Sequence, residues 1–175
     1  DPDILSRMNR HGSAEHIRRM VDYIRRASPE FILRTTVMTG FPGETEEQFD
    51  RLAEFLREHP FDRLGAFAFS PEEGTPAAEF PDTVDGGVAR RRLDAIMRQQ
   101  RGISRKLSQK RVGREYEALI EEIKDGVALC RSYAEAPEAD GKIAVSGAPE
   151  GARPGDFIRA RVVSAGAYDL KGVYL

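Results

Sequence analysis

Residues 31–48 read FILRTTVMTGFPGETEEQ, and this stretch decides the fold of the first part of the chain. Its beginning, residues 31–39, is rich in β-branched residues and predicts a buried strand. The segment Gly40–Glu44 then predicts a tight turn, because glycine allows backbone angles that other residues avoid. Thr45 and Gln48 have the spacing of a capping box, which starts a helix. A strand that leads through a turn into a helix is typical of a parallel α/β sheet.

The same alternation continues on both sides of this stretch. Apolar residues at helical spacing and β-rich runs predict helices at residues 17–24, 49–56 and 87–110, with strands at residues 31–39 and 62–70. The two strands are expected to be parallel neighbours joined by a right-handed crossover. Because two strands alone cannot form a stable sheet core, we expect residues 1–110 to be the final units of a larger α/β barrel or open sheet.

After residue 110 the pattern becomes all-β. Candidate strands lie at residues 115–123, 126–133, 142–146, 156–164 and 167–175, separated by turn signals such as Asp125-Gly126. Short strands at this spacing suggest a small closed barrel of the OB type. The predicted domains are therefore residues 1–110, α/β, and residues 111–175, all-β.

Composition and charge exclude several classes of protein. The chain has 27 Lys and Arg against 29 Asp and Glu, so its net charge of −2 does not fit a strongly basic nucleic-acid protein. No run of about 20 apolar residues is present, so we expect no contact with a membrane. The low cysteine content predicts a cytoplasmic location. The single cysteine, Cys130, excludes an internal disulfide and a cysteine-ligated metal site within this chain. Since the chain begins at Asp1 rather than Met, we expect it to be part of a longer protein.

Two predicted turns share one edge of the sheet, because each follows the carboxyl end of a strand. Ligands of parallel α/β folds bind at that edge. The candidate residues are Gly40, Phe41, Pro42, Gly43 and Glu44 after the first strand, and Phe69 and Ser70 after the second. Glu44, Glu46, Glu47, Glu72 and Glu73 predict an acidic rim that suits a cation or a basic segment. The alternative is an ordinary turn that only connects a strand to a helix.

Basic residues provide two further candidates. Arg34 lies within an otherwise uncharged strand, where it either grips a carboxylate inside a barrel or forms an ion pair with a neighbouring strand. Residues 88–111 hold nine Lys and Arg against one acid, Asp94. This helix either faces RNA or presents a solvated basic face. No arrangement of Ser, His, Cys or Asp typical of a catalytic centre or a metal site is present, so no catalytic or metal-ligating residue is predicted in this chain.

Several segments together resemble one known family, the radical S-adenosylmethionine methylthiotransferases. These segments are Leu5–Arg10, Leu33–Thr36, Gly40–Thr45 and Phe69–Thr75, and residues 111–175 resemble the TRAM domain of that family. Arg34–Thr36, Ala136–Gly141 and Tyr168–Gly172 resemble the branch that modifies an aspartate of small-subunit ribosomal protein twelve. Tyr168 itself is expected either to contact that protein or, more simply, to lie in a core.

The resemblance implies a fold, cofactors and site residues. The fold would be the terminal βα units of a partial TIM-like radical S-adenosylmethionine barrel, followed by the OB-like TRAM barrel. The complete enzyme would use S-adenosylmethionine and two four-iron–four-sulfur clusters whose ligands lie outside this chain, so the chain alone is expected to be inactive. The residues implied to bind the cofactor are Arg34, Gly40, Phe41, Pro42, Gly43, Glu44, Phe69 and Ser70.

The implied partners are ribosomal protein twelve, or the ribosome, and the amino-terminal part of the same protein. Residues 111–175 hold nine basic and eleven acidic residues, a balance that suits a basic protein partner better than RNA. The alternatives are the branch of the family that modifies adenosine in transfer RNA, and a non-enzymatic module that binds RNA or protein.

Overall fold

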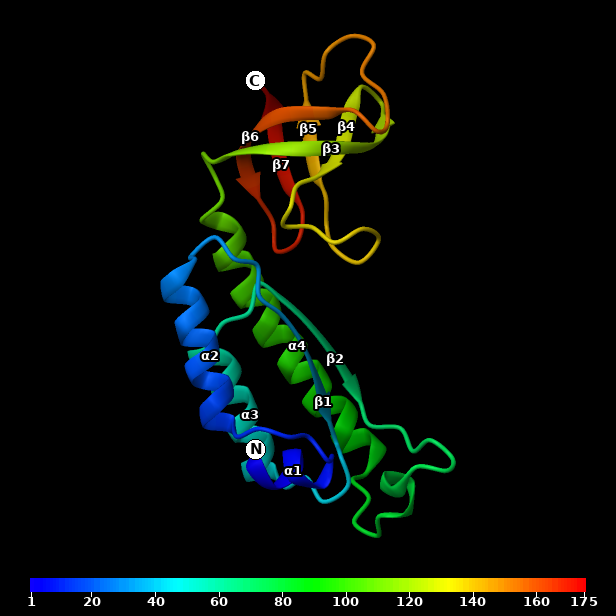
Figure 1. Ribbon diagram of the computed structural model, residues 1–175. Coiled ribbons are helices and arrows are strands. Elements are labelled where there is room, and N and C mark those ends of the chain that lie inside the picture. The colour runs from blue at the N-terminus through cyan, green and yellow to red at the C-terminus, as the bar shows by residue number, and fades with distance from the viewer. The chain divides into compact units, whose positions relative to one another are not determined.

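The computed structural model describes all residues from Asp1 to Leu175. It divides the chain into two compact units, Asp1–Ile103 and Ser104–Leu175 (Figure 1). The division falls within the long helix α4, Gly86–Gln109, whereas the sequence predicted a change of character near residue 110. The last turn and a half of α4 therefore belongs to the second unit.

The first unit alternates helices and strands. In chain order it contains α1 (Pro2–Arg7), α2 (Ala14–Ala27), β1 (Arg34–Thr39), α3 (Glu46–Glu58), β2 (Arg63–Ala68), the short 3-10 helix η1 (Pro76–Glu79) and most of α4. The predicted capping box is confirmed, because the Gln48 N–H donates to Thr45 Oγ1 at 3.2 Å and the Thr45 N–H donates to Gln48 Oε1 at 3.0 Å. None of these helices combines the length and the hydropathy that crossing a membrane requires.

The short helices α1 and η1 were not predicted from the sequence. α1 has six residues, of which only Ile4 is buried, so it offers no helical repeat of apolar positions. It begins at Asp1, whose carboxylate accepts hydrogen bonds from the N–H groups of Asp3 and Ile4 at 3.0 and 3.2 Å. η1 has no buried residue at all.

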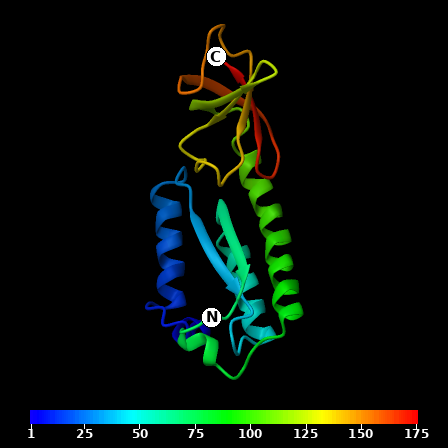
Figure 2. The same cartoon turned by 90° about the vertical axis from the view of Figure 1, so that its right-hand side faces the viewer.

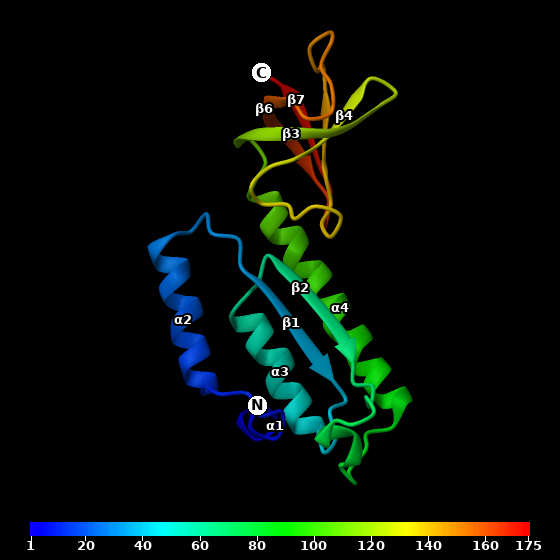
Figure 3. The same cartoon turned by 45° about the vertical axis from the view of Figure 1, so that its right-hand side comes forward.

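The two strands of the first unit pair in parallel, as predicted, with Arg34 opposite Arg63 and Thr39 opposite Ala68 (Figure 2). One face of this sheet packs on α2, α3 and α4, and α3 lies directly behind the strands in Figure 3. The buried side chains of that core are Val21, Phe49, Leu56, Phe61 and Ile96. The other face is open, and Phe67 on it is 46% exposed.

The second unit is the closed five-strand barrel that the sequence predicted. Its strands are β3 (Glu115–Lys124), β4 (Val127–Arg131), β5 (Ile143–Ser146), β6 (Phe157–Ala165) and β7 (Leu170–Tyr174), in the order β3-β4-β5-β7-β6. β5 and β7 pair in parallel, and every other pair is antiparallel. Register shifts between Ile120 and Glu122 and between Val162 and Ser164 bend the two longest strands, which helps the sheet to close.

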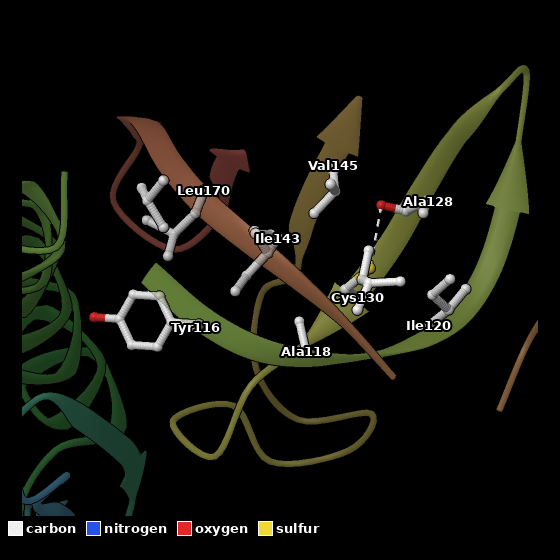
Figure 4. Close-up of a cluster of buried hydrophobic side chains, with 11 residues drawn as sticks. Tyr116, Ala118, Ile120, Ala128, Cys130, Ile143, Val145 and Leu170 are labelled. Carbon is white, nitrogen blue, oxygen red and sulfur yellow. Dashed lines mark hydrogen bonds between the residues drawn. The ribbon is translucent and has the colours of Figure 1, made fainter. Parts of the chain in front are cut away.

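Alternate residues of the barrel strands point inward and form its core (Figure 4). The core side chains include Ala118, Ala128, Ile143 and Val145, none of which is exposed to solvent. Cys130 lies among them, and its thiol donates to the Ala128 carbonyl at 3.6 Å. Burial, together with the charge of Glu121, raises the pKa of this thiol to about 11. Cys130 is therefore an uncharged core residue at neutral pH.

The two barrel motifs that carried the family resemblance pack against each other. The Lys142 N–H donates to Asp169 Oδ1 at 3.0 Å, and a Cβ added at Gly141 would lie 2.6 Å from the Tyr168 carbonyl oxygen. Only glycine allows this approach. Tyr168 is 43% exposed, so the expectation of a core tyrosine is wrong.

A buried ion pair ties the segment after α4 to the barrel. Arg111 donates to the Glu135 carboxylate, to Tyr116 Oη at 3.2 Å and to Ser132 Oγ at 3.2 Å. The second oxygen of Glu135 accepts from the Ser132 N–H at 2.9 Å and from its hydroxyl at 2.7 Å. Burial alone would raise the pKa of Glu135, but the hydrogen bonds and charge of Arg111 outweigh it and lower the pKa below its ordinary value.

We expect Glu135→Gln to destabilise the barrel by about 3 kcal/mol at neutral pH, because it leaves the buried Arg111 guanidinium without its counter-charge. Urea unfolding followed by tyrosine fluorescence measures this, since Tyr116, Tyr133, Tyr168 and Tyr174 all lie in the second unit.

The pH dependence of that difference follows from the lowered pKa of Glu135. The charged pair stabilises the fold above the ordinary glutamate pKa of about 4.3, and this contribution is lost as the pH falls through the lower pKa of the folded state. The difference in the free energy of unfolding between the unchanged protein and Glu135→Gln should therefore disappear in acid. Glu150→Gln, at an exposed position, is the control and should unfold like the unchanged protein. A constant gap down to the lowest pH would contradict the assignment.

Candidate functional site beside the glycine loop

The structure brings the two predicted turns together at the carboxyl edge of the sheet. The Phe69 N–H donates to the Thr39 carbonyl at 2.8 Å, which continues the strand pairing up to the turns. The ring centroids of Phe41 and Phe69 lie 5.3 Å apart in an edge-to-face arrangement. Phe80, from the segment after η1, lies 6.1 Å from Phe41 in the same way. The Gly40–Glu44 turn, called the glycine loop below, thus adjoins an aromatic cluster.

A hollow of about 560 Å³ opens beside this cluster. We call it the aromatic hollow, and its walls come from the segment after α1, from both strands and from the segment 69–80. Its lining residues include Arg7, Met8, Arg10, Met38, Phe41, Phe67, Phe69, Ser70, Glu72 and Phe80. The aromatic and thioether surfaces suit a flat apolar group, and Ser70 and Glu72 supply hydrogen-bonding groups at its rim.

The packing of α4, rather than a ligand, explains why position 40 is a glycine. Its φ is +72°, and a Cβ at this position would lie only 2.3 Å from Ala89 Cβ. The Thr39 hydroxyl donates to the Ala89 carbonyl at 3.0 Å in the same buried contact. The absence of a side chain at Gly40 therefore lets α4 approach the end of β1.

The space that a side chain at Gly43 would need is likewise occupied by the protein itself. Its φ is +80°, and a Cβ there would lie 1.9 Å from Arg7 Nη1. The Gly43 N–H donates to the Asp82 carbonyl at 2.6 Å, and Arg7 reaches the Asp82 carboxylate at 3.5 Å. The Arg7 guanidinium also lies 5.2 Å from the centre of the Phe80 ring. Arg7 thus connects α1, the glycine loop and the segment after η1 around the aromatic hollow.

Glu44 holds the glycine loop to α4 through a buried ion pair. Its carboxylate accepts from Arg92 Nη1 at 2.8 Å and from the Gly40 N–H at 2.9 Å, and both side chains of the ion pair are less than a tenth exposed. Arg92 also reaches Glu46 at 2.8 Å. Burial lowers the pKa of Arg92, but its bonds to Glu46 and Glu44 outweigh this and raise it. The expected acidic rim is thus partly wrong, because Arg92 neutralises two of its carboxylates.

The remaining candidates differ in their placement. Pro42 is fully buried within the loop, and Ser70 is exposed at the hollow. Arg34 starts β1 and lies five residues from the end of that strand, which is roughly 17 Å away at about 3.3 Å per residue. Its side chain is exposed and lines neither this hollow nor its neighbour. The structure therefore does not bring Arg34 to the candidate site.

Several site residues were missed by the sequence reasoning. Arg7, Met8 and Arg10 belong to a segment that carried the family resemblance but received no role. Phe67 lies within a predicted strand, where its alternation with half-buried neighbours is a signal for the open face. Nothing in the local sequence singles out Phe80, whose position follows from tertiary packing alone.

The first comparison with known proteins defines a class for the second unit. Residues 112–175 match the family model of the TRAM domain. The closed barrel of β3–β7 thus matches the TRAM domain, as the sequence resemblance implied.

The comparison of the whole chain is more particular. The chain is 42% identical over 169 residues to the ribosomal protein uS12 methylthiotransferase RimO of Thermosipho africanus, a match that covers 97% of this chain and 39% of that protein. It is 44% identical over 168 residues to the same enzyme of Desulforudis audaxviator, covering 96% and 37%. The resemblance to this branch of the methylthiotransferases is confirmed. The chain spans less than two fifths of the length of these relatives.

A solved structure, the apo form of RNase R from Mycoplasma genitalium, superposes on 49% of this chain with 14% identity and a TM-score of 0.27. This likeness is too weak to support an inference.

Gly40→Ala should destabilise the first unit by roughly 2–4 kcal/mol, through the strained positive φ and the overlap with Ala89. Hydrogen exchange of the β1 and α3 amides measures the change. The double variant Gly40→Ala with Ala89→Gly should recover the part due to overlap. The control is Gly102→Ala on α4, where an added Cβ meets nothing within 4 Å and should stabilise the helix slightly. Equal exchange rates in Gly40→Ala and the unchanged chain would contradict this packing.

Proposed function

We propose that this chain is part of a methylthiotransferase that adds a methylthio group to the β-carbon of an aspartate in small-subunit ribosomal protein uS12. The observation that carries the proposal is the identity of 42–44% to proteins of that name along nearly the whole chain. The first unit is proposed to form the terminal units of a radical S-adenosylmethionine barrel. Its open sheet face would then look into the barrel.

The aromatic hollow fits the nucleoside part of S-adenosylmethionine. The half-buried Phe69 offers aromatic surface to an adenine ring, with the buried Phe41 packed edge-to-face against it, and the exposed Ser70 hydroxyl can donate to or accept from a polar group at the rim. Gly40, Pro42, Gly43 and Glu44 act by holding this wall in place, since their own neighbours are protein atoms. S-adenosylmethionine supplies the radical chemistry when bound, while this chain binds and orients it.

An iron–sulfur cluster does not fit the residues of this chain. Cys130 lies in the barrel core with a raised pKa, and a cluster needs thiolate ligands. His, Cys, Asp and Glu side chains form no group of three or more that could hold a metal ion. The cysteine ligands of the proposed clusters would therefore belong to other parts of the complete protein, and this chain alone should be inactive.

The TRAM domain is proposed to contact the ribosomal protein or the ribosome. The balance of nine basic and eleven acidic residues in residues 111–175 suits a basic partner through electrostatic steering. The basic face of α4 is the observation that favours the alternative, modification of transfer RNA. Six of its basic residues are exposed, namely Arg90, Arg91, Arg98, Arg101, Arg105 and Lys106, and the exposed Lys110 directly follows the helix. The relatives' names and the charge of the barrel favour the protein substrate.

The direct test uses the complete protein with reconstituted clusters, S-adenosylmethionine and a reductant. Purified uS12 and transfer RNA are offered in parallel, and mass spectrometry follows both. We expect one aspartate of uS12 to gain a methylthio group in place of a hydrogen, and transfer RNA to remain unchanged. Modification of transfer RNA alone, or of neither substrate, would reject the proposal.

A further inference from the structure

Arg10 is presented to the site by a fixed turn after α1. The Arg10 N–H donates to the Leu5 carbonyl at 2.8 Å, and the Asn9 N–H donates to the Ser6 carbonyl at 2.9 Å. Between them Asn9 adopts a φ of +53°, a left-handed conformation that asparagine tolerates better than most residues. This backbone ends the helix and directs the next residue toward the open face of the sheet.

Arg10 lies where two hollows meet. A second hollow, of about 420 Å³, adjoins the aromatic hollow, and the two share Met8, Arg10, Met38 and Phe67 as lining residues. Three of these four residues are apolar. Arg10 is exposed and is the one charged residue among these four, so it can present its guanidinium to a ligand at the junction.

Most of the other charged side chains of the two hollows are engaged with partners in the protein, and the exposed Glu72 lines only the aromatic hollow. Arg7 contacts Asp82, and Glu44 is paired with Arg92. The carboxylate of Asp1, which lines the second hollow, is held by Arg51 at 2.8 Å. Arg10 makes no such contact, so its guanidinium is available to a ligand.

We propose that Arg10 binds a carboxylate at the junction of the two hollows. A guanidinium matches a carboxylate with two parallel N–H···O bonds, which fixes both the charge and the orientation of the ligand. This inference rests on the proposed function, in which two carboxylates reach the site. One is the side chain of the target aspartate, and the other is the amino-acid carboxylate of S-adenosylmethionine.

Arg10 thereby takes the role that the sequence suggested for Arg34. A residue that grips the target aspartate would position its β-carbon and reject an asparagine or a neutral side chain in its place. This would make Arg10 a determinant of substrate choice.

The test compares Arg10→Gln with the unchanged complete protein. Calorimetry measures the binding of S-adenosylmethionine and of a uS12 peptide. The peptide is used in two forms, one with aspartate and one with asparagine at the target position. Loss of a charged hydrogen-bonded pair should weaken binding of the carboxylate ligand roughly 10-fold to 100-fold. Arg101→Gln, an exposed arginine of α4 that lines neither hollow, is the matched control and should bind all ligands normally.

Each outcome has a distinct meaning. A loss confined to the aspartate peptide supports Arg10 as the ligand of the substrate carboxylate, and a loss confined to S-adenosylmethionine supports it as the ligand of the cofactor carboxylate. Unchanged binding in both measurements, or an equal loss for the aspartate and asparagine peptides, overturns the inference. If the unchanged protein neither binds nor modifies uS12, the proposed function fails instead, and this is seen before any variant is made.

Discussion

The close contact between the end of β1 and α4 organises the first unit. Gly40 leaves room for Ala89, the Thr39 hydroxyl bonds to the Ala89 carbonyl, and Glu44 forms a buried ion pair with Arg92. These contacts hold the glycine loop against the helix and turn Phe41 toward Phe69. The walls of the aromatic hollow follow from this arrangement, because a loop free to move would not keep the two rings in contact.

The second unit depends on a different constraint, the closure of its barrel. Five short strands leave no free sheet edge, and the inward side chains form one continuous core. Arg111 and Glu135 add a buried polar connection to the segment that follows α4. Each unit thus contains a buried ion pair between a glutamate and an arginine. In the first unit the pair links a helix to a loop, and in the second it links the segment just after the helix to a loop.

Much of the fold could be predicted because it rests on local patterns. The β-branched strand of residues 34–39, the Thr45 capping box and the alternation in the barrel strands are each visible within a few residues. α1 could not be predicted, since six residues with one buried side chain carry no period. The domain division within α4 was also beyond local reasoning, because one continuous helix supplies residues to both units.

The candidate site was predictable in position but not in detail. The sequence places the two turns at one edge of a parallel sheet, and the structure brings Phe41 and Phe69 together there. The sequence alone does not indicate that Ala89 and Arg7 fill the space that side chains at Gly40 and Gly43 would need. These contacts join segments far apart in the chain. The emphasis on Arg34 came from its unusual place in a strand, whereas it is Arg10 that lines the two hollows.

The aromatic hollow beside the glycine loop is proposed to bind the nucleoside of S-adenosylmethionine. Hydrogen exchange of the complete protein, with and without S-adenosylmethionine, tests it most directly. The account predicts that the cofactor slows exchange at the amides of Phe41, Phe69 and Ser70 and leaves the barrel strands β3–β7 unchanged. Protection that spares all three of these amides would contradict it.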